Sequence, residues 1–377
     1  PLASSESNLS SIRRHSLENC KIEEFSFEGV SLGLAHRRLS IIDLSPNGHQ
    51  PMTRKGKVWI VYNGEVYNYL EIKAELESEG ISFTSDTDTE VVLAAYEKWG
   101  TKSFDRFNGM WAMAILDLRE RKMVLSRDRF GIKPLYLYSD GDGLAFASEI
   151  KSFQAMPGWN SRANEGAIHD FLFKNLSDHT KETFFRGVYQ LLPGRLISID
   201  IDAERHDLNS IEQQHWYQLP SPNKEIPLGQ AVDRFKELFI DSVRLRMRSD
   251  VKLGSCLSGG LDSSSIVGAM RALSKDSSID VITSCSLHKK FDESLYADLV
   301  ARYTCSQSTK VFPDPDNLAD ILDGLVWHQD EPFGSASIYA QWCVFEKARK
   351  LGISVMLDGQ GADESHCGYN SFLRPYV

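Results

Sequence analysis

Runs of apolar residues in the first half of the chain predict a sheet. Residues 58–62 (Val-Trp-Ile-Val-Tyr) are continuously apolar, which is typical of a buried strand. The Asn-Gly-Glu segment at 63–65 predicts a turn out of that strand. Further strands are predicted over 110–116, 122–126, 134–138 and 143–147.

Two segments between these strands have helical periodicity. Tyr69, Ile72 and Leu76 recur at helical spacing, and Gly80 ends that helix. Residues 86–90 (Asp-Thr-Asp-Thr-Glu) predict the cap of a second helix. The face of this second helix consists of Val92, Ala95, Tyr96 and Trp99, and Gly100 is its stop. We expect a sheet-rich layer with helices packed on it.

The second half contains a strand, a glycine turn and a helix in succession. Residues 251–257 predict a buried strand, and 258–265 (Ser-Gly-Gly-Leu-Asp-Ser-Ser-Ser) predict the turn and the helix start. The apolar positions of that helix are Ile266, Val267, Met270 and Leu273. A second apolar strand, 353–357, runs into a Gly- and Asp-rich loop at 358–364. Two such strands suit an open parallel sheet, in which ligands bind beyond the carboxyl ends of the strands.

The length and the composition favour two domains. The chain has 377 residues, enough for two ordinary domains. Residues 200–229 are polar and rich in proline towards their end, without periodicity, which is typical of a linker. We place the boundary near residue 220, with a first domain at 1–219, a linker at 220–229 and a second domain at 230–377.

Charge and cysteine content exclude several classes of protein. The net charge of −10 argues against a nucleic-acid surface, and no apolar run reaches transmembrane length. The chain opens on Pro1 without a secretory signal, and it reads as a fragment. The cysteines show no metal-binding spacing, so we expect reduced, mostly buried thiols in a cytoplasmic protein. They are Cys20, Cys256, Cys285, Cys305, Cys343 and Cys367. The sequence is compatible with a homodimer.

The glycine turn at 257–265 is a candidate phosphate site. A turn between a strand and a helix start directs backbone N–H groups at an anion, and the helix dipole favours it. The turn lacks the lysine of the common nucleotide-binding P-loop. Asp262 supplies a carboxylate of the kind that Mg²⁺ prefers, and Asp363 could meet it across one metal ion. The alternative is an ordinary helix entry in which a serine or aspartate is the N-cap.

Several motifs, in a fixed order along the chain, resemble those of a known family. The segments 34–43, 50–52, 62–68, 85–90 and 127–136 resemble the glutaminase domain of class II amidotransferases. The segment 257–265 resembles the SGGxDS loop of ATP-pyrophosphatases. The whole is similar to the glutamine-dependent asparagine synthetases, in which 291–293 and 330–333 also have counterparts. The resemblance implies an α+β sandwich of the αββα, N-terminal-nucleophile type, followed by an α/β ATP-pyrophosphatase domain with a parallel sheet.

The resemblance also implies a glutamine site in the first domain. An arginine fork suits the substrate α-carboxylate, two acids suit its α-ammonium group, and Asn63 with Gly64 can offer N–H donors to an oxyanion. The residues implied are Arg38, Leu39, Ser40, Ile41, Ile42, Asn63, Gly64, Glu65 and Asp88. The alternatives are a hairpin turn at Asn63-Gly64, a helix N-cap at Asp88 and a surface ion pair at Arg38.

The family's nucleophile, an N-terminal cysteine, has no counterpart in this chain. Residues 1–27 fit the family poorly, and Cys20 lies too close to Arg38 to take that role. We therefore expect weak glutamine binding without hydrolysis.

In the second domain the resemblance implies activation of a carboxylate by ATP. Aspartate would form β-aspartyl-AMP with release of pyrophosphate, and ammonia would displace AMP. The implied ATP-binding residues are Leu257, Ser258, Gly259, Gly260, Asp262, Ser263, Ser264, Asp358, Gly359 and Gln360. Asp262 and Asp363 are the implied catalytic residues and Mg²⁺ ligands. Many relatives have glutamate where Gln360 stands, and an amide cannot act as a base.

Three functions compete at this point. The first is asparagine synthesis from aspartate, ATP and glutamine or ammonia. The second is a related amidotransferase or lactam-forming synthetase that acts on another carboxylate. The third is a non-catalytic regulatory homologue. For the first two functions we expect small-molecule substrates, and neither nucleic acid nor a membrane as a partner.

Overall fold

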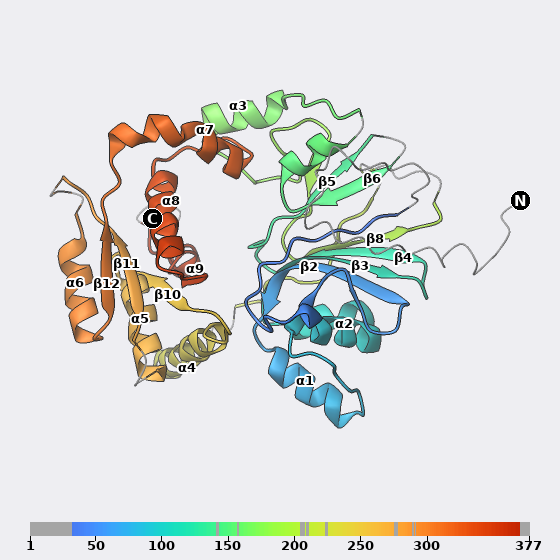
Figure 1. Cartoon of the computed structure of the whole chain (residues 1–377), viewed down its shortest axis with the longest axis horizontal. Coiled ribbons are helices and arrows are strands. Elements are labelled where there is room, and N and C mark those ends of the chain that lie inside the picture. Colours follow the sequence, from blue (N-terminus) through green and yellow to red (C-terminus); the bar gives the residue numbers. More distant parts are fainter. Residues whose placement is uncertain are drawn as a thin grey trace, which may run out of the picture.

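The computed structural model consists of two units that lie side by side (Figure 1). It describes residues 32–369, except 141–142, 157, 204–207, 209–210, 223–224, 275–277, 289 and 291. The predictions about Cys20 and the divergent start at 1–27 lie outside the described residues. The front unit runs from blue to green in Figure 1, and the rear unit from yellow to red.

A six-stranded antiparallel sheet forms the centre of the front unit. Both of its faces are buried, because residues such as Ile60 pack on one side and neighbours such as Val61 on the other. This explains why the strand over 58–62 is continuously apolar. In spatial order the strands are β1 (Met52–Thr53), β2 (Val58–Val66), β3 (Gly109–Asp117), β4 (Lys122–Arg127), β8 (Arg195–Asp200) and β9 (Gln214–His215).

Layers on both sides of this sheet complete an αββα sandwich. Helices α1 (Tyr69–Ser78) and α2 (Asp88–Trp99) cover one face. A three-stranded sheet covers the other, in the order β6 (Leu144–Ala147), β5 (Tyr136–Ser139) and β7 (Val188–Gln190). The short helix η5 (Ile150–Ala155) packs on the outside of that sheet. The expected fold class of the first domain is confirmed.

Two local predictions in the front unit are wrong. Asn63, Gly64 and Glu65 are not a turn but the interior of β2, paired with Ala112, Trp111 and Met110 of β3. Part of the segment 200–229 belongs to the sheet rather than to a linker, because β9 pairs with β8 and the ring of Trp216 stacks on Trp111 at 5.2 Å. In both places long-range pairing outweighs the local turn or linker signal.

The rear unit is built on a four-stranded parallel sheet. Its order is β12 (Gln307–Val311), β11 (Asp280–Ser284), β10 (Leu253–Cys256) and β13 (Val355–Leu357). The predicted strands at 251–257 and 353–357 are present but shorter, and the α/β class is confirmed. The surrounding helices are α4 (Leu228–Arg246), α5 (Leu261–Leu273), α6 (Ser294–Tyr303), α7 (Leu318–Gln329), α8 (Ser337–Lys350) and α9 (Ala362–His366).

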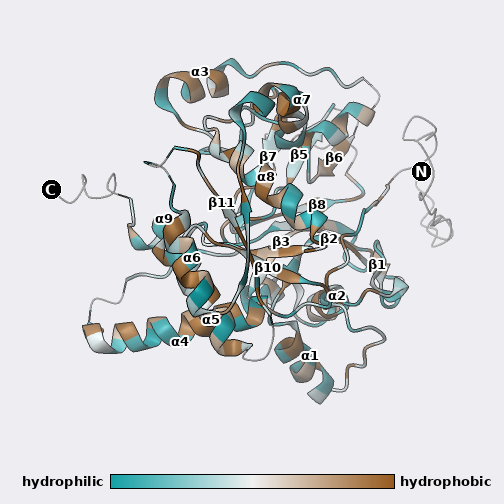
Figure 2. Cartoon of the chain, turned by 60° about the vertical axis from the view of Figure 1, so that its left-hand side comes forward, coloured by the Kyte–Doolittle hydropathy of each residue, from teal (hydrophilic) through white to brown (hydrophobic). Residues whose placement is uncertain are grey.

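Helix α4 connects the two units. It begins at Leu228, just before the expected end of the linker. Figure 2 shows apolar and polar residues alternating along it. Above it in Figure 1, helix α3 (Glu165–Lys174) of the front unit lies near α7. In the described part of the chain, no helix is long and apolar enough to cross a membrane.

The cysteines differ in part from expectation. The five described ones are free, as predicted, but only Cys285 is fully buried. Cys305 and Cys367 are exposed, because each lies in the turn that ends a short helix rather than on its inner face.

Candidate functional site

Two acidic side chains, Glu65 and Asp88, are buried in the front unit. Each is only 5% exposed. Asp88 accepts hydrogen bonds from the Val66 backbone N–H and the Tyr62 hydroxyl, both at 3.0 Å. Burial raises the pKa of Asp88. Burial, together with the Asp88 carboxylate, raises the pKa of Glu65 to about 8, although Lys133 and Arg246 oppose this. The pair is suited to receive a cation.

The alternative role of Asp88 as a helix N-cap is wrong. The N-cap of α2 is Thr87, whose hydroxyl accepts from the Thr89 N–H at 3.3 Å. Asp88 is the first residue of the helix, and its side chain turns towards β2 instead. Its carboxylate therefore faces the sheet and does not cap the start of the helix.

Gln50 and Tyr62 support this pair and were missed by the sequence analysis as site residues. The Gln50 side chain brackets the Tyr62 backbone, since its Oε1 accepts from the Tyr62 N–H at 2.6 Å and its Nε2 donates to the Tyr62 carbonyl at 3.2 Å. The Tyr62 hydroxyl then reaches Asp88. Gln50 lies within the motif at 50–52, which is the signal that could have identified it.

The Arg38 guanidinium is enclosed by its own loop rather than forming a surface ion pair. It donates to the carbonyls of Ile42 and Ser45 at 2.7 and 3.0 Å and to that of Asp43 at 2.5 Å. A substrate carboxylate would have to use the N–H groups that these carbonyls leave. Of the other residues predicted in this stretch, Ile42 is in the core, Leu39 is 71% exposed, and Ser40 and Ile41 are half-buried.

The loop that holds Arg38 is fixed next to the start of α2. The Asp43 carboxylate accepts from the Asp86 N–H at 3.1 Å, and Asp86 lies two residues before Asp88. The structure thus brings the Arg38 loop and the Glu65–Asp88 pair to the same end of the sheet.

Asn63 and Gly64 lie on strand β2 beside these groups. A Cβ on Gly64 would lie 2.2 Å from the Met110 carbonyl oxygen, so the close approach of β3 requires glycine here. The Asn63 amide donates to the Ser148 hydroxyl at 3.2 Å. The hairpin-turn alternative is wrong, because both residues are paired within the sheet.

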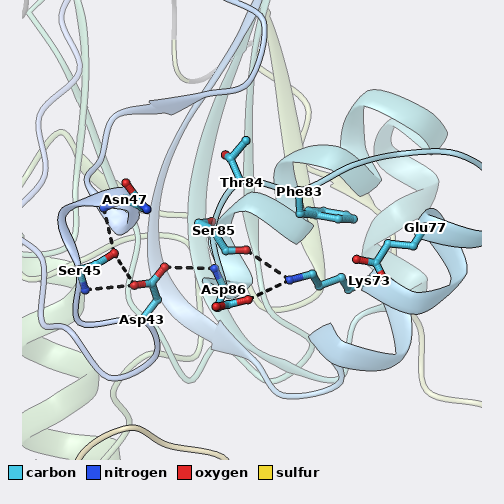
Figure 3. Close-up of a pocket in the computed structure, with 9 residues that line it drawn as sticks. All are labelled: Asp43, Ser45, Asn47, Lys73, Glu77, Phe83, Thr84, Ser85 and Asp86. Atoms are coloured by element: carbon cyan, nitrogen blue, oxygen red, sulfur yellow. Dashed lines mark hydrogen bonds and ion pairs between the residues drawn. The ribbon is translucent and has the colours of Figure 1, made fainter.

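A neighbouring pocket of about 420 Å³ does not coincide with the predicted glutamine residues. Figure 3 shows Lys73 directed at Ser85 and Asp86, and Asp43 directed at Ser45 and Asp86. The residues that line this pocket are Asp43, Ser45, Asn47, Lys73, Glu77, Phe83, Thr84, Ser85 and Asp86.

In the rear unit, the loop between β10 and α5 has the form expected of an anion site. Gly259 has a φ of +91°, and a Cβ there would lie 2.6 Å from the Ala297 backbone nitrogen. The Ser258 and Ser263 hydroxyls lie 3.0 Å apart, and that of Ser258 accepts from the Gly260 N–H at 3.1 Å. Hydroxyls and a glycine thus fix the loop against α6.

The start of α5 is open to a ligand. Its N-cap is Gly260, which provides no side-chain cap, so the alternative of a serine or aspartate N-cap is wrong. The N–H groups of a first helical turn then need another acceptor. Within the described part of the chain, the buried Ser264 hydroxyl also has no hydrogen-bond partner. Leu257 is buried, and its carbonyl accepts from the Thr283 hydroxyl at 2.7 Å.

The second loop, after β13, packs against the first. A Cβ on Gly359 would lie 3.0 Å from the Asp262 Cβ and 3.2 Å from the Ser263 nitrogen. The strands before the two loops are neighbours, and the Ser255 hydroxyl donates to the Leu357 carbonyl at 3.0 Å. The two loops therefore meet at the carboxyl end of the sheet, where the strand order reverses.

Acidic side chains of both loops act on the same group, the Tyr369 hydroxyl. A hydrogen bond to Glu364 raises the pKa of Tyr369, and the charges of Asp363 and Asp262 add to the effect. Asp358 has a different role. Burial raises the pKa of the Cys256 thiol, and the Asp358 carboxylate, which is hydrogen-bonded to that thiol, raises it further. Gln360 is exposed in the same loop.

The donor set at this point fits a magnesium ion bound together with phosphates. Among the residues that the structure describes, no group of three or more His, Cys, Asp or Glu side chains is arranged to hold a metal alone. Mg²⁺ in nucleotide sites takes only one or two carboxylates and completes its shell with phosphates and water. Asp262 and Asp363, each in the first turn of a helix, are carboxylates of that kind.

The segment 330–333 contacts the front unit. The Asp330 carboxylate accepts from the Ile150 N–H at 2.8 Å, and that of Glu331 accepts from the Phe184 N–H at 2.8 Å. Burial raises the pKa of Glu331 to about 7. In the other family segment, Asp292 accepts from the Ser294 hydroxyl, and Phe291 lies outside the described residues. The hydrogen bonds of Asp330 and Glu331 thus join the two units.

Comparisons with known proteins agree with this division. Residues 23–216 match the model of the glutamine amidotransferase domain, and residues 234–377 match that of asparagine synthase. A putative glutamine-hydrolyzing asparagine synthetase 2 of Methanocaldococcus jannaschii is 34% identical and is covered over 93% of this chain and 70% of its own length. Asparagine synthetase 1 of Bacillus subtilis is 31% identical, over 93% of this chain and 54% of its own length.

The chain thus has the two-part construction of an amidotransferase joined to a synthetase, and it belongs to the family of glutamine-hydrolysing asparagine synthetases. Fungal proteins also match, among them Amidase chry2 of Gibberella zeae, which is 31% identical over 90% of this chain and 52% of its own length. The chain spans about half the length of several of these relatives.

Proposed function

We propose that the chain takes part in ATP-dependent synthesis of asparagine from aspartate, with glutamine or ammonia as the nitrogen donor. The aspartate β-carboxylate attacks the α-phosphorus of ATP to give β-aspartyl-AMP and pyrophosphate. Ammonia then displaces AMP. The substrates are small molecules, and the proposed location is the cytoplasm.

The observation that carries this proposal is the contact of Gly359 with the first turn of α5. It brings the Asp262 and Asp363 loops to one edge of the parallel sheet. Ser258, Gly259, Gly260, Ser263 and Ser264 are proposed to hold the pyrophosphate, with Leu257, Asp358, Gly359 and Gln360 beside the nucleotide. Asp262 and Asp363 would hold Mg²⁺, which supplies neutralisation of phosphate charge when bound.

The front unit is proposed to bind glutamine. Glu65 and Asp88 are buried with a raised pKa, so an α-ammonium group would favour their ionised forms. Arg38 would share its remaining N–H groups with the α-carboxylate. These residues together would hold the two charged ends of the glutamine backbone.

A second candidate is amidation of another carboxylate. The similarity to Amidase chry2 favours it, because that protein carries a different activity in its name while sharing 31% of the aligned residues. The nucleotide chemistry would be the same, and only the acceptor acid would differ.

Release of pyrophosphate tests both candidates. The protein is incubated with ATP, Mg²⁺ and ammonium, with and without aspartate. Release that requires aspartate supports asparagine synthesis, and release only with another acid supports the second candidate. Absence of release with every acid tested would contradict both.

A further inference from the structure

Three residues of the rear unit reach across to the proposed glutamine pocket. They lie on the interdomain strap, which we define as residues 246–250, between the end of α4 and strand β10. Arg246 is the last residue of α4, and Arg248 and Asp250 follow in the loop before β10. The side chains of all three contact the front unit. They contact two parts of the front unit, which we call the two walls of the proposed glutamine site: the loop that encloses Arg38, and the end of β2 beside Glu65.

Asp250 contacts the first wall, the loop that encloses Arg38. Its carboxylate accepts from the Asp43 N–H at 2.8 Å, and its own N–H donates to the Ile41 carbonyl at 3.0 Å. The two bonds hold the backbone on both sides of Ile42. Asp250 thus fixes the peptide between Ile42 and Asp43, whose carbonyl binds the Arg38 guanidinium.

The loop needs such support because its backbone is strained at Asp43. This residue has a φ of +54°, a left-handed conformation that disfavours residues with a Cβ. The Asp43 side chain stabilises that conformation from within by accepting from the Ser45 N–H at 3.0 Å. Asp250 stabilises it from outside. Loss of the outer contact is expected to let the loop, and with it Arg38, depart from its present position.

Arg248 and Arg246 contact the second wall, where β2 ends after Glu65. Arg248 donates to the Tyr67 carbonyl at 2.6 Å and pairs with both carboxylate oxygens of Glu71, at 2.6 and 2.5 Å. The Arg246 guanidinium lies over the Tyr67 ring, 4.5 Å from its centroid. Its charge also favours the ionised form of Glu65. The strap therefore holds both the Arg38 side and the Glu65 side.

We propose that the interdomain strap positions the glutamine pocket, with Asp250 acting on Arg38 through the loop 41–43. This rests on the proposed glutamine binding of the front unit. The rear unit on this account supplies no group that touches glutamine, and Asp250 is a positioning residue. A front unit without the strap would bind glutamine more weakly.

The test is calorimetric titration of glutamine into the full chain and its variants. In Asp250→Ala the Kd for glutamine is expected to rise about fivefold, the range for loss of a partly exposed hydrogen bond. Asp250→Asn keeps an oxygen that can accept from the Asp43 N–H, so it is expected to retain near wild-type affinity. The control is Glu237→Ala, since Glu237 pairs with Arg234 on the exposed face of α4.

Amide hydrogen exchange provides a readout that does not depend on glutamine. The amide of Asp43 is expected to exchange faster in Asp250→Ala than in the wild type, while amides of α2 are unchanged. An unchanged Kd in Asp250→Ala, or an equal loss in Asp250→Asn, overturns the positioning role. If the wild type binds no glutamine, the proposed glutamine binding fails. Exchange at Asp43 then decides separately whether the strap holds the loop, and unchanged exchange in Asp250→Ala overturns that part.

Discussion

The two candidate sites of this molecule achieve their chemistry in opposite ways. In the front unit, Glu65 and Asp88 are ionisable groups buried in a packed sandwich, and burial itself raises their pKa. In the rear unit, the loop after β10 lies at the surface and presents backbone N–H groups at the open start of α5. The first site would bind a cationic group, because its buried acids need a positive charge to ionise. The second would bind an anion, because its backbone N–H groups need an acceptor.

The difference follows from how each site is positioned. Strand pairing and core packing hold the front residues, so their geometry depends on the whole sheet. The rear loop depends on a few glycines and hydroxyls, because Gly259 and Gly359 allow close approach of α6 and α5. A single substitution is therefore expected to change stability most in the front unit and ligand binding most in the rear unit.

The largest effect is expected at the proposed metal ligand. Replacing Asp262 by alanine should lower the rate of pyrophosphate release by more than about a hundredfold, since even outer-shell partners of metal sites contribute 10- to 100-fold. The measurement is the initial rate with ATP, Mg²⁺, ammonium and aspartate. Asp298→Ala is the matched control, because Asp298 pairs with Lys310 on the surface of the same unit. Normal turnover in Asp262→Ala would refute the metal assignment.

A charge change at Glu65 should separate stability from binding. The pKa of Glu65 in the folded chain is about 8, above its ordinary value of 4.5. The unfolded chain therefore loses this proton first, and stability falls as the pH rises from about 4.5 to 8.

Glu65→Gln should remove that fall. Without glutamine, the variant should be more stable than the wild type at pH 8, by on the order of a few kcal/mol. Its glutamine affinity should be lower. Urea unfolding at pH 5 and pH 8 provides the measurement, with Glu346→Gln as a surface control. A variant that is less stable than the wild type at pH 8 would show that Glu65 is already paired with a cation.

A smaller effect is expected from adding one methyl group to the rear loop. Gly259→Ala places a Cβ 2.6 Å from the Ala297 nitrogen at a φ of +91°, so the loop must shift. We expect a loss of about 1–3 kcal/mol in unfolding free energy and weaker binding of ATP. Thermal unfolding with and without ATP and Mg²⁺ measures both. Retention of wild-type nucleotide affinity would show that the loop conformation is not required.

The smallest effect is the opposite change at a glycine in the same helix. A Cβ on Gly268 meets no atom within 4 Å. Gly268→Ala should therefore stabilise the protein by about 0.5–1 kcal/mol through helix propensity, with unchanged binding of ATP. Thermal unfolding again provides the measurement, and destabilisation would indicate an unseen contact on that face of α5.

Local pattern predicted the elements of both units better than it predicted their partners. The strand at 58–62 and the helix after Gly260 are present because burial and glycine chemistry are local signals. Asn63-Gly64 has a strong turn signal, yet both residues lie inside β2, which pairs with β3 along its whole length. The motif at 50–52 marks Gln50 but does not give its partner, Tyr62, which is 12 positions away. Asp250 gains its role from a contact with Asp43, 207 positions away, which no local pattern contains.

Proton release on glutamine binding tests the account of the front site most directly. Titrations at pH 7 in buffers of different ionisation enthalpy count the protons exchanged. Since the pKa of Glu65 is about 8 in the free chain, most of the carboxyl groups are protonated at pH 7. An incoming α-ammonium group would ionise them, so close to one proton should be released per glutamine bound. Binding with no release, or with uptake, would contradict the central claim.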